Sequence, residues 1–177
     1  MGYLKIFLNF FRFIFLKIRF GSRLKCSFVQ SVSFGTKFRI GKGSSVKIGR
    51  NLVTDGRCVI DASGGGRIVI GDGVYLNDGA VLSAKDYVEI GSGTLFGPNV
   101  KVYDNNHIFT SQGVSFKYKC APIKVGEKCW LASNAVILKG VSVGNCSVIS
   151  AGVVLRQSVP EKSPITQKSE VLVKPIL

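Results

Sequence analysis

The hydrophobic residues between Val125 and Val159 recur at every sixth position. They are Val125, Leu131, Ile137, Val143, Ile149 and Leu155. A period of six fits neither the 3.6 residues of a helical turn nor the two-residue alternation of a hairpin. It is typical of a solenoid in which each triangular coil has three short faces and pairs with the next coil through parallel strands. The pattern therefore predicts an all-β fold.

The same period extends backwards to Phe28. The further positions are Phe28, Phe34, Ile40, Ile48, Thr54, Ile60, Ile70, Leu76, Leu82, Ile90, Phe96 and Val102. All except Thr54 are apolar, and we expect the series to point into the core. Glycine follows eight of the positions in the two stretches together, as corners with permissive backbone angles require. The series predicts about six coils.

The spacing of the coils shows where the chain departs from the repeat. Coils begin at Phe28, Ile48, Ile70, Ile90, Val125 and Val143. Only the step from Val125 to Val143 equals three six-residue faces, and each earlier step is longer, with the excess at the same corner each time. The largest excess is a loop at about residues 103–124. Because a loop of this length is too long for a tight turn, we expect it to be functional.

Residues 3–20 form an amphipathic pattern with a narrow polar face. On a helix, Lys5, Asn9, Arg12 and Arg19 share one side, and Phe, Ile and Leu cover most of the rest. The segment is too charged for a cleavable signal peptide. If it spanned a bilayer, Arg12 would lie near the centre at a cost of about 2.5–3.5 kcal/mol. We expect it to bind an anionic membrane surface, where arginine can reach phosphate groups. Spanning the bilayer and packing within the protein's own oligomer are the alternatives.

The chain divides into a basic amphipathic segment (residues 1–25), the β-helix (residues 26–160) and a tail (residues 161–177). The open ends of a solenoid expose unpaired backbone groups that something must cover. The N-terminal segment is the candidate cap at one end. The tail loses the period and contains two further prolines after Pro160, and we expect it to close the last coil or pack on a neighbour.

The net charge of +14 is concentrated in the first third of the chain. Through Thr54 there are eleven Lys and Arg residues and no Asp or Glu, whereas the rest has 13 basic and 10 acidic residues, a net charge of +3. The basic surface therefore belongs to the N-terminal end. Nucleic-acid binding is not expected, because the basic residues alternate with bulky apolar ones in a way that suits lipid better.

His107 is the only histidine in the chain and lies where the long loop begins. It is either a solvated loop residue or a general base, since imidazole titrates near neutral pH and can accept a proton from a hydroxyl. Because each copy of the chain has one histidine, a zinc site with three histidines from one chain is excluded. No metal is expected.

Three other residues are candidates for the site, and each also has a purely structural interpretation. Trp130 is the sole tryptophan and is either a packing residue or the wall of a pocket. Asn77 is either a corner asparagine that tolerates a left-handed backbone or a polar contact. Asp104 either orients the imidazole of His107 or closes a turn at the base of the loop. No pair of carboxylates is spaced for acid–base catalysis.

Several motifs together resemble one family. Phe96-Gly97-Pro98-Asn99-Val100 and Tyr103-Asp104-Asn105-Asn106-His107 precede the loop, Cys129-Trp130-Leu131-Ala132 follows it, and Ile149-Ser150-Ala151-Gly152 closes the repeat. This combination resembles the left-handed β-helix, or hexapeptide-repeat, acyltransferases. It is most similar to the bacterial sugar O-acetyltransferases of capsule, O-antigen and exopolysaccharide synthesis.

The resemblance implies a homotrimer with an active site between neighbouring prisms. Acetyl-CoA would be the donor, and a hydroxyl of a sugar or of a lipid-linked glycan would be the acceptor. His107 matches the catalytic base, Asn77 an acceptor contact, and Trp130 the wall of the donor and acceptor pocket. The backbone at Ser133 and Ala151 matches positions that line the pantetheine arm.

Two residues depart from the family pattern. Asn105 replaces a second histidine that relatives often have. Gln157 replaces a lysine near the CoA phosphates, and Arg156 is the nearest candidate substitute, although neighbouring strand residues point in opposite directions.

Two other functions fit the same pattern. One is N-acetylation of an amino sugar, and the other is a non-catalytic, glycan-binding or structural solenoid. The odd number of cysteines, with no Cys-x-x-Cys pair, indicates a reducing compartment. We therefore expect a cytoplasmic protein at the inner face of the membrane. The sequence does not name the sugar, its hydroxyl or the length of the acyl group.

Overall fold

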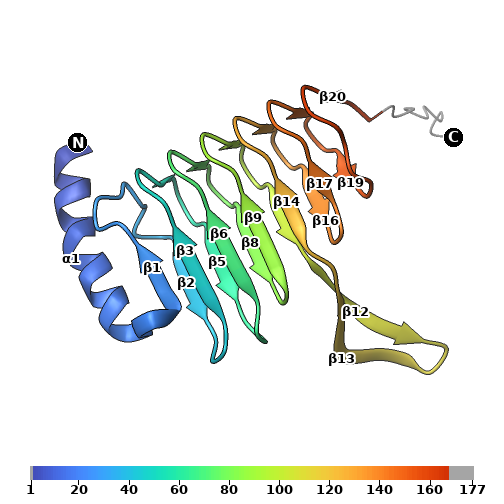
Figure 1. Cartoon of the computed structure of the whole chain (residues 1–177), viewed down its shortest axis with the longest axis horizontal. Helices are drawn as coiled ribbons and strands as arrows, with labels where there is room; N and C mark the ends of the chain where they lie inside the picture. Colours follow the sequence, from blue (N-terminus) through green and yellow to red (C-terminus); the bar gives the residue numbers. More distant parts are fainter. Residues whose placement is uncertain (1, 168–177) are drawn as a thin grey trace, which may run out of the picture.

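The computed structural model describes residues 2–167 as a left-handed β-helix with one helix across its N-terminal end (Figure 1). Helix α1 (Gly2–Phe20) and a 3-10 turn, η1 (Gly21–Arg23), lead into three parallel six-stranded sheets. Sheet A contains β1 (Leu24–Cys26), β3 (Ser45–Ile48), β6 (Arg67–Ile70), β9 (Tyr87–Ile90), β14 (Ile123–Val125) and β17 (Ser142–Val143). Sheet B contains β4 (Val53–Thr54), β7 (Tyr75–Leu76), β10 (Leu95–Phe96), β15 (Trp130–Leu131), β18 (Val148–Ile149) and β20 (Pro164–Ile165). Sheet C contains β2 (Lys37–Ile40), β5 (Val59–Ala62), β8 (Val81–Ala84), β11 (Lys101–Tyr103), β16 (Val136–Leu138) and β19 (Val154–Leu155).

The six-residue period is confirmed from the second coil onward. Ile48, Ile70 and Ile90 are paired across sheet A, and the corresponding positions on sheets B and C are also stacked. These side chains are buried. Thr54 is the polar exception. Its burial is tolerated because its hydroxyl forms a 2.7 Å hydrogen bond with the hydroxyl of Thr36.

The first coil differs from the prediction. Cys26, rather than Phe28, is paired with Ile48, and Phe38, rather than Ile40, is paired with Ile60. The expected inward position of Phe28 and Phe34 is therefore wrong: 36% and 61% of their surfaces are exposed. A shift of two residues preserves the alternation of a strand, so the sequence pattern cannot distinguish the two registers.

The glycines that follow the inward positions serve close approach rather than an unusual backbone angle. Gly91 has no positive φ, but a Cβ there would lie 2.5 Å from the backbone carbon of Gly126 in the next coil. Real Cβ atoms do not approach backbone so closely. The residue is needed because consecutive coils touch at this corner.

The insertions project from the corner between sheets C and A, as the spacing predicted. The longest becomes an antiparallel hairpin of β12 (Asn105–Thr110) and β13 (Gly113–Cys120), which leaves the prism between the fourth and fifth coils (Figure 1). At the C-terminal end, β20 pairs with β18, so the described part of the tail continues the stack. The rest of the predicted tail lies outside the described residues.

Helix α1 caps the first coil with a mixed face, on which Phe13, Leu16 and Phe20 are buried beside Asn9 and Arg12. Asn9 Nδ2 donates to the carbonyl of Val32 at 2.9 Å, and the Arg12 guanidinium donates to the carbonyls of Ser33 and Thr36 at 2.8 and 2.6 Å. The predicted cap is confirmed. Arg12 is turned toward the first coil, which accepts two of the hydrogen bonds that the prediction assigned to lipid phosphates. No helix in residues 2–167 is both long and apolar enough to cross a membrane.

Candidate functional site

Asp104 fixes the base of the hairpin. Its side chain is fully buried, and its carboxylate accepts hydrogen bonds from the backbone N–H groups of Lys85 and Asp86 at 2.7–3.0 Å and from Asn105 Nδ2 at 2.8 Å. These contacts tie the start of β12 to the corner of the preceding coil. Of the two predicted roles for Asp104, the geometry favours closing the base of the loop.

His107 lies on the exposed first strand of the hairpin. Its Nδ1 is 2.9 Å from the carbonyl oxygen of Ser115, and its ring centre is 4.6 Å from that of Tyr118. A carbonyl can only accept, so the neutral imidazole has its proton on Nδ1 and a free lone pair on Nε2. The hairpin thereby fixes both the orientation and the tautomer of the ring, which is the condition for a general base.

A cleft of about 390 Å³ opens beside this ring. It is lined by Asn106, His107, Ile108, Phe109, Lys119 and Lys139. The imidazole therefore faces a space between the hairpin and the fifth coil and is not isolated in solvent. Two ammonium groups on the wall make the cleft suitable for an anionic ligand.

Lys119 and Lys139 were not recognised from the sequence. Lys139 lies one full coil before Gln157 in the repeat, so the two occupy the same corner. The one-coil spacing between Lys139 and Gln157 could have identified Lys139 in the sequence as a lysine near the site. Arg156, the predicted substitute, is exposed two coils beyond the hairpin, directly after Leu155 of β19.

The remaining predicted residues form a second group at the corner between sheets B and C. Ser133 and Ala151 occupy equivalent positions of adjacent coils, and the Ser133 carbonyl accepts a hydrogen bond from Gly152 N at 3.0 Å. Asn77 lies at the same corner two coils earlier, where its Oδ1 accepts from Asp78 N at 2.8 Å. This contact fits a corner residue, but the left-handed backbone expected at Asn77 is wrong, because its φ is not positive.

Trp130 lies on the outer surface of sheet B, next to this corner. Its side chain is 51% exposed and is opposite Leu95, which is also 47% exposed. The indole is therefore half-buried against its neighbour, which fits a partly buried packing residue, and its exposed half is available as the wall of a pocket.

One chain does not bring the two groups together. His107 and Arg156 lie at the corner between sheets C and A, whereas Asn77, Ser133 and Ala151 lie at the opposite edge of sheet C.

The thiol nearest the cleft is not an activated nucleophile. Cys120 ends the hairpin, and burial, together with the charges of Asp104 and Asp86, raises the pKa of its thiol. A protonated thiol attacks poorly. The chemistry of the cleft therefore depends on the imidazole.

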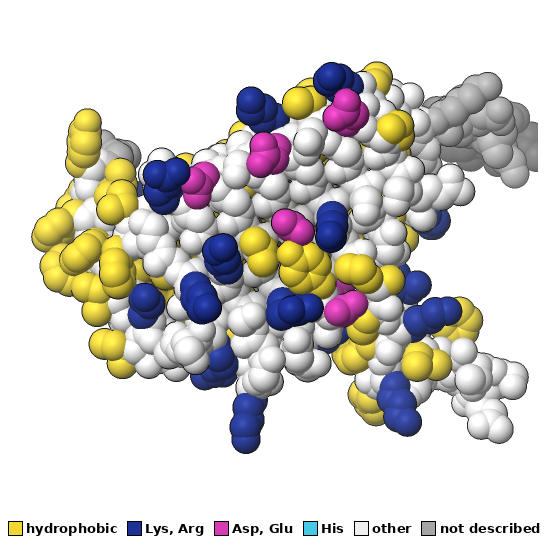
Figure 2. Space-filling model, in the orientation of Figure 1, with side chains coloured by type: hydrophobic (Ala, Val, Ile, Leu, Met, Phe, Trp, Pro, Cys, Tyr) yellow, Lys and Arg dark blue, Asp and Glu magenta, His cyan; other side chains and the backbone are white. Residues whose placement is uncertain are grey.

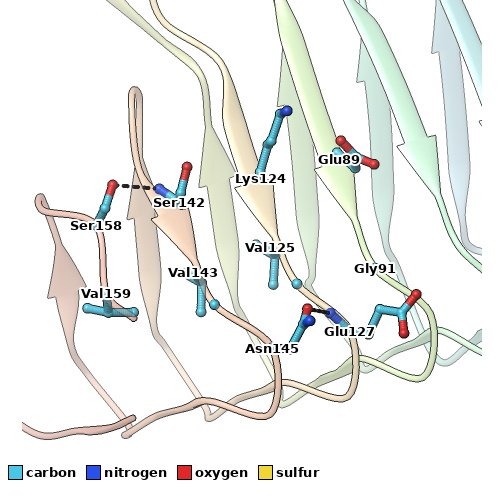
Figure 3. Close-up of a pocket in the computed structure, with 12 residues that line it drawn as sticks. Glu89, Gly91, Lys124, Val125, Glu127, Ser142, Val143, Asn145, Ser158 and Val159 are labelled. Atoms are coloured by element: carbon cyan, nitrogen blue, oxygen red, sulfur yellow. Dashed lines mark hydrogen bonds between the residues drawn. The ribbon is translucent and has the colours of Figure 1, made fainter. Parts of the chain in front are cut away.

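A second cavity of about 450 Å³ lies on the outer face of sheet A over the last coils (Figure 3). Glu89, Lys124, Ser142 and Ser158 point outward there from neighbouring strands or loops. None of the predicted site residues lines it. In the part of the chain that the structure describes, no cluster of three His, Cys, Asp or Glu residues is placed to hold a metal ion.

The family described as "Bacterial transferase hexapeptide (six repeats)" matches residues 122–157. Over this fifth of its length the chain is similar to the hexapeptide-repeat transferases. The matched segment contains Trp130, Ser133 and Ala151, whereas His107 precedes it.

Curated relatives of this hexapeptide-repeat protein include two from Escherichia coli K12. WbbJ, named "Putative lipopolysaccharide biosynthesis O-acetyl transferase", is 28% identical over 151 residues, which are 76% of this chain and 74% of WbbJ. A galactoside O-acetyltransferase is 31% identical over 100 residues, 54% of this chain and 48% of the relative. The chain thus spans about three quarters of the first and about half of the second.

Among solved structures, AntD from Bacillus cereus, an N-acyltransferase, is similar in fold. The TM-score is 0.65 at 14% identity, over 85% of this chain and 81% of AntD. At this identity the similarity supports the hexapeptide-repeat fold alone.

Proposed function

We propose that this protein transfers an acetyl group from acetyl-CoA to a hydroxyl of a sugar in surface polysaccharide or glycolipid synthesis. The observation that carries the proposal is the imidazole of His107, which keeps Nδ1 on the Ser115 carbonyl, leaves the lone pair of Nε2 free and lines the cleft. The names of WbbJ and the galactoside O-acetyltransferase support a sugar hydroxyl as the acceptor.

His107 acts as the general base in a direct transfer. Nε2 takes the proton of the hydroxyl while its oxygen attacks the thioester carbonyl, and such a base contributes about 10²–10⁴-fold. A backbone N–H beside Ser133 stabilises the oxyanion of the tetrahedral intermediate, as in the family. Collapse of the intermediate releases CoA, which takes the proton from the imidazolium and leaves as the free thiol.

The working enzyme is a trimer with each site between two chains. His107 of one copy meets the corner of Asn77 and Ser133 of a neighbour, which one chain alone keeps apart across sheet C. The exposed apolar residues of the hairpin support this arrangement: Phe109, Val114 and Phe116 are 77%, 74% and 95% exposed. A neighbouring prism would cover them and exclude water from the cleft.

The test compares wild type with His107→Ala, and Gln112→Ala at the exposed hairpin tip is the matched control. Released CoA is measured by chromatography, because the exposed thiol of Cys146 would react with thiol reagents. We expect His107→Ala to keep CoA binding, measured by thermal shift, and to lose transfer about 10²–10⁴-fold. The control should keep wild-type activity.

Three outcomes would contradict the proposal. Full turnover by His107→Ala would remove the imidazole as the base. Faster transfer to an amino sugar that does not depend on His107 would assign N-acetylation, because a free amine needs less activation. The absence of any thermal shift with CoA would assign a non-catalytic solenoid.

A further inference from the structure

The outward side of α1 is almost entirely apolar. Its exposed residues are Tyr3, Leu4, Phe7, Leu8, Phe10, Phe11, Phe15 and Ile18, with exposures from 40% to 92%. Figure 2 shows this surface as the largest gathering of hydrophobic side chains in the view, at the end of the prism. We call these eight residues the apolar end face.

The capping contacts explain why the helix presents this side to solvent. The polar side chains of α1 turn toward the coils. Asn9 and Arg12 donate hydrogen bonds to carbonyl groups of the first coil, and Lys5 donates to the carbonyl of Thr54 in the second coil. The opposite side of the helix must then point away from the protein. Phe28 extends the face, because its ring centre lies 5.8 Å from that of Phe10.

Basic side chains border the apolar end face. Lys17 Nζ lies 5.2 Å from the centre of the Phe28 ring, and Arg19 and Lys25 are exposed close by in the sequence. The chain ahead of Asp55 contains eleven Lys and Arg and no acidic residue. An amphipathic helix with bulky apolar residues on one side and flanking cations is suited to the interface of an anionic bilayer.

The same charge argues against a second copy as the occupant. End-to-end pairing would bring together two ends that each have an excess of basic residues, and like charges disfavour that contact. A second copy with a parallel axis would lie beside the prism. It would not cover the apolar end face, because the helix lies across the end of the prism (Figure 1).

We propose that the apolar end face docks this protein on an anionic membrane surface, with the β-helix standing on its N-terminal end. The hairpin leaves the prism after the fourth coil, so three strand spacings place its base about 14 Å from the first coil. If the proposed function holds, the site faces acceptors that extend from the bilayer surface. The docking itself does not depend on that function.

The experiment measures flotation of the full chain with vesicles. Phosphatidylglycerol–phosphatidylcholine vesicles are compared with pure phosphatidylcholine. We expect binding to the anionic vesicles that weakens with salt, and a loss of about tenfold or more in Phe11→Glu/Phe15→Glu. Ser111→Glu/Gln112→Glu, which adds the same charge at the exposed hairpin tip, should bind as wild type does.

Two further readouts separate the outcomes. Transfer to a soluble acceptor should be unchanged in Phe11→Glu/Phe15→Glu, so loss of docking and failure of the proposed function remain distinguishable. Equal vesicle binding by this variant, or no wild-type binding at low salt, would overturn the proposal. If the wild type forms an oligomer and Phe11→Glu/Phe15→Glu does not, the face belongs to a contact with a neighbouring copy instead.

Discussion

The middle coils and the N-terminal end of this protein differ in how polar and apolar residues share the inward side. In the middle coils, side chains such as Leu76 and Leu82 point inward and are fully buried. In α1, Asn9 and Arg12 point toward the protein beside the buried Phe13, while Phe7 on the other side points to solvent. A middle coil has its backbone paired with coils on both sides, whereas the first coil has no coil before it. The unpaired carbonyls at this end, together with the burial of Phe13, Leu16 and Phe20, therefore decide which side of the helix faces inward.

Phe96→Ala tests the interior side of this comparison and should have the largest effect. Phe96 is 1% exposed on β10, stacked between Leu76 and Leu131. Truncation leaves a cavity that the coils above and below cannot close, so we expect the free energy of unfolding to fall by about 3–5 kcal/mol. Urea unfolding at a fixed protein concentration measures this change. Leu95→Ala, at the neighbouring outward position, is the control, and a loss below about 1 kcal/mol in Phe96→Ala would contradict the role of the inward stack.

The interior could be predicted because one physical rule decides it. Each inward residue meets the equivalent residue one coil away, so a constant spacing is enough to place Leu82 or Ile137. The rule fails at Phe28, where no preceding coil fixes the register. It also predicts which corner releases the long loop, because every excess residue must leave the stack there.

The site was predicted only in part for a similar reason. Ser133 and Ala151 are exactly one coil apart in the repeat, so their shared corner follows from the period. The ring of His107 is oriented by Ser115 and Tyr118 through an antiparallel pairing that the six-residue pattern does not contain. Contacts across such a hairpin depend on its own register and cannot be predicted from the repeat.

Asp104→Asn tests the junction between the stack and the hairpin and should have an intermediate effect. The amide keeps one acceptor but places an NH₂ group against backbone N–H donors, so we expect a loss of about 2–3 kcal/mol in the free energy of unfolding. The hairpin should also become more sensitive to trypsin at Lys117 and Lys119. Asp86→Asn removes a nearby charge whose carboxylate has no hydrogen bond among the described residues. If both variants behave alike, charge rather than the buried contacts of Asp104 holds the hairpin.

The smallest effects are expected on α1, where two substitutions on opposite sides of one helix sharpen the comparison. Arg12→Met removes the donors to the carbonyls of Ser33 and Thr36 but keeps the aliphatic stem, so we expect a loss of about 1–2 kcal/mol. Phe15→Ser removes a much larger apolar surface that is 61% exposed, and it should change the free energy of unfolding by no more than about 0.5 kcal/mol. Thermal and urea unfolding in vesicle-free buffer measure both variants. If Phe15→Ser were the more destabilising, the apolar end face would already be covered in solution, and its exposure would not be a property of the free protein.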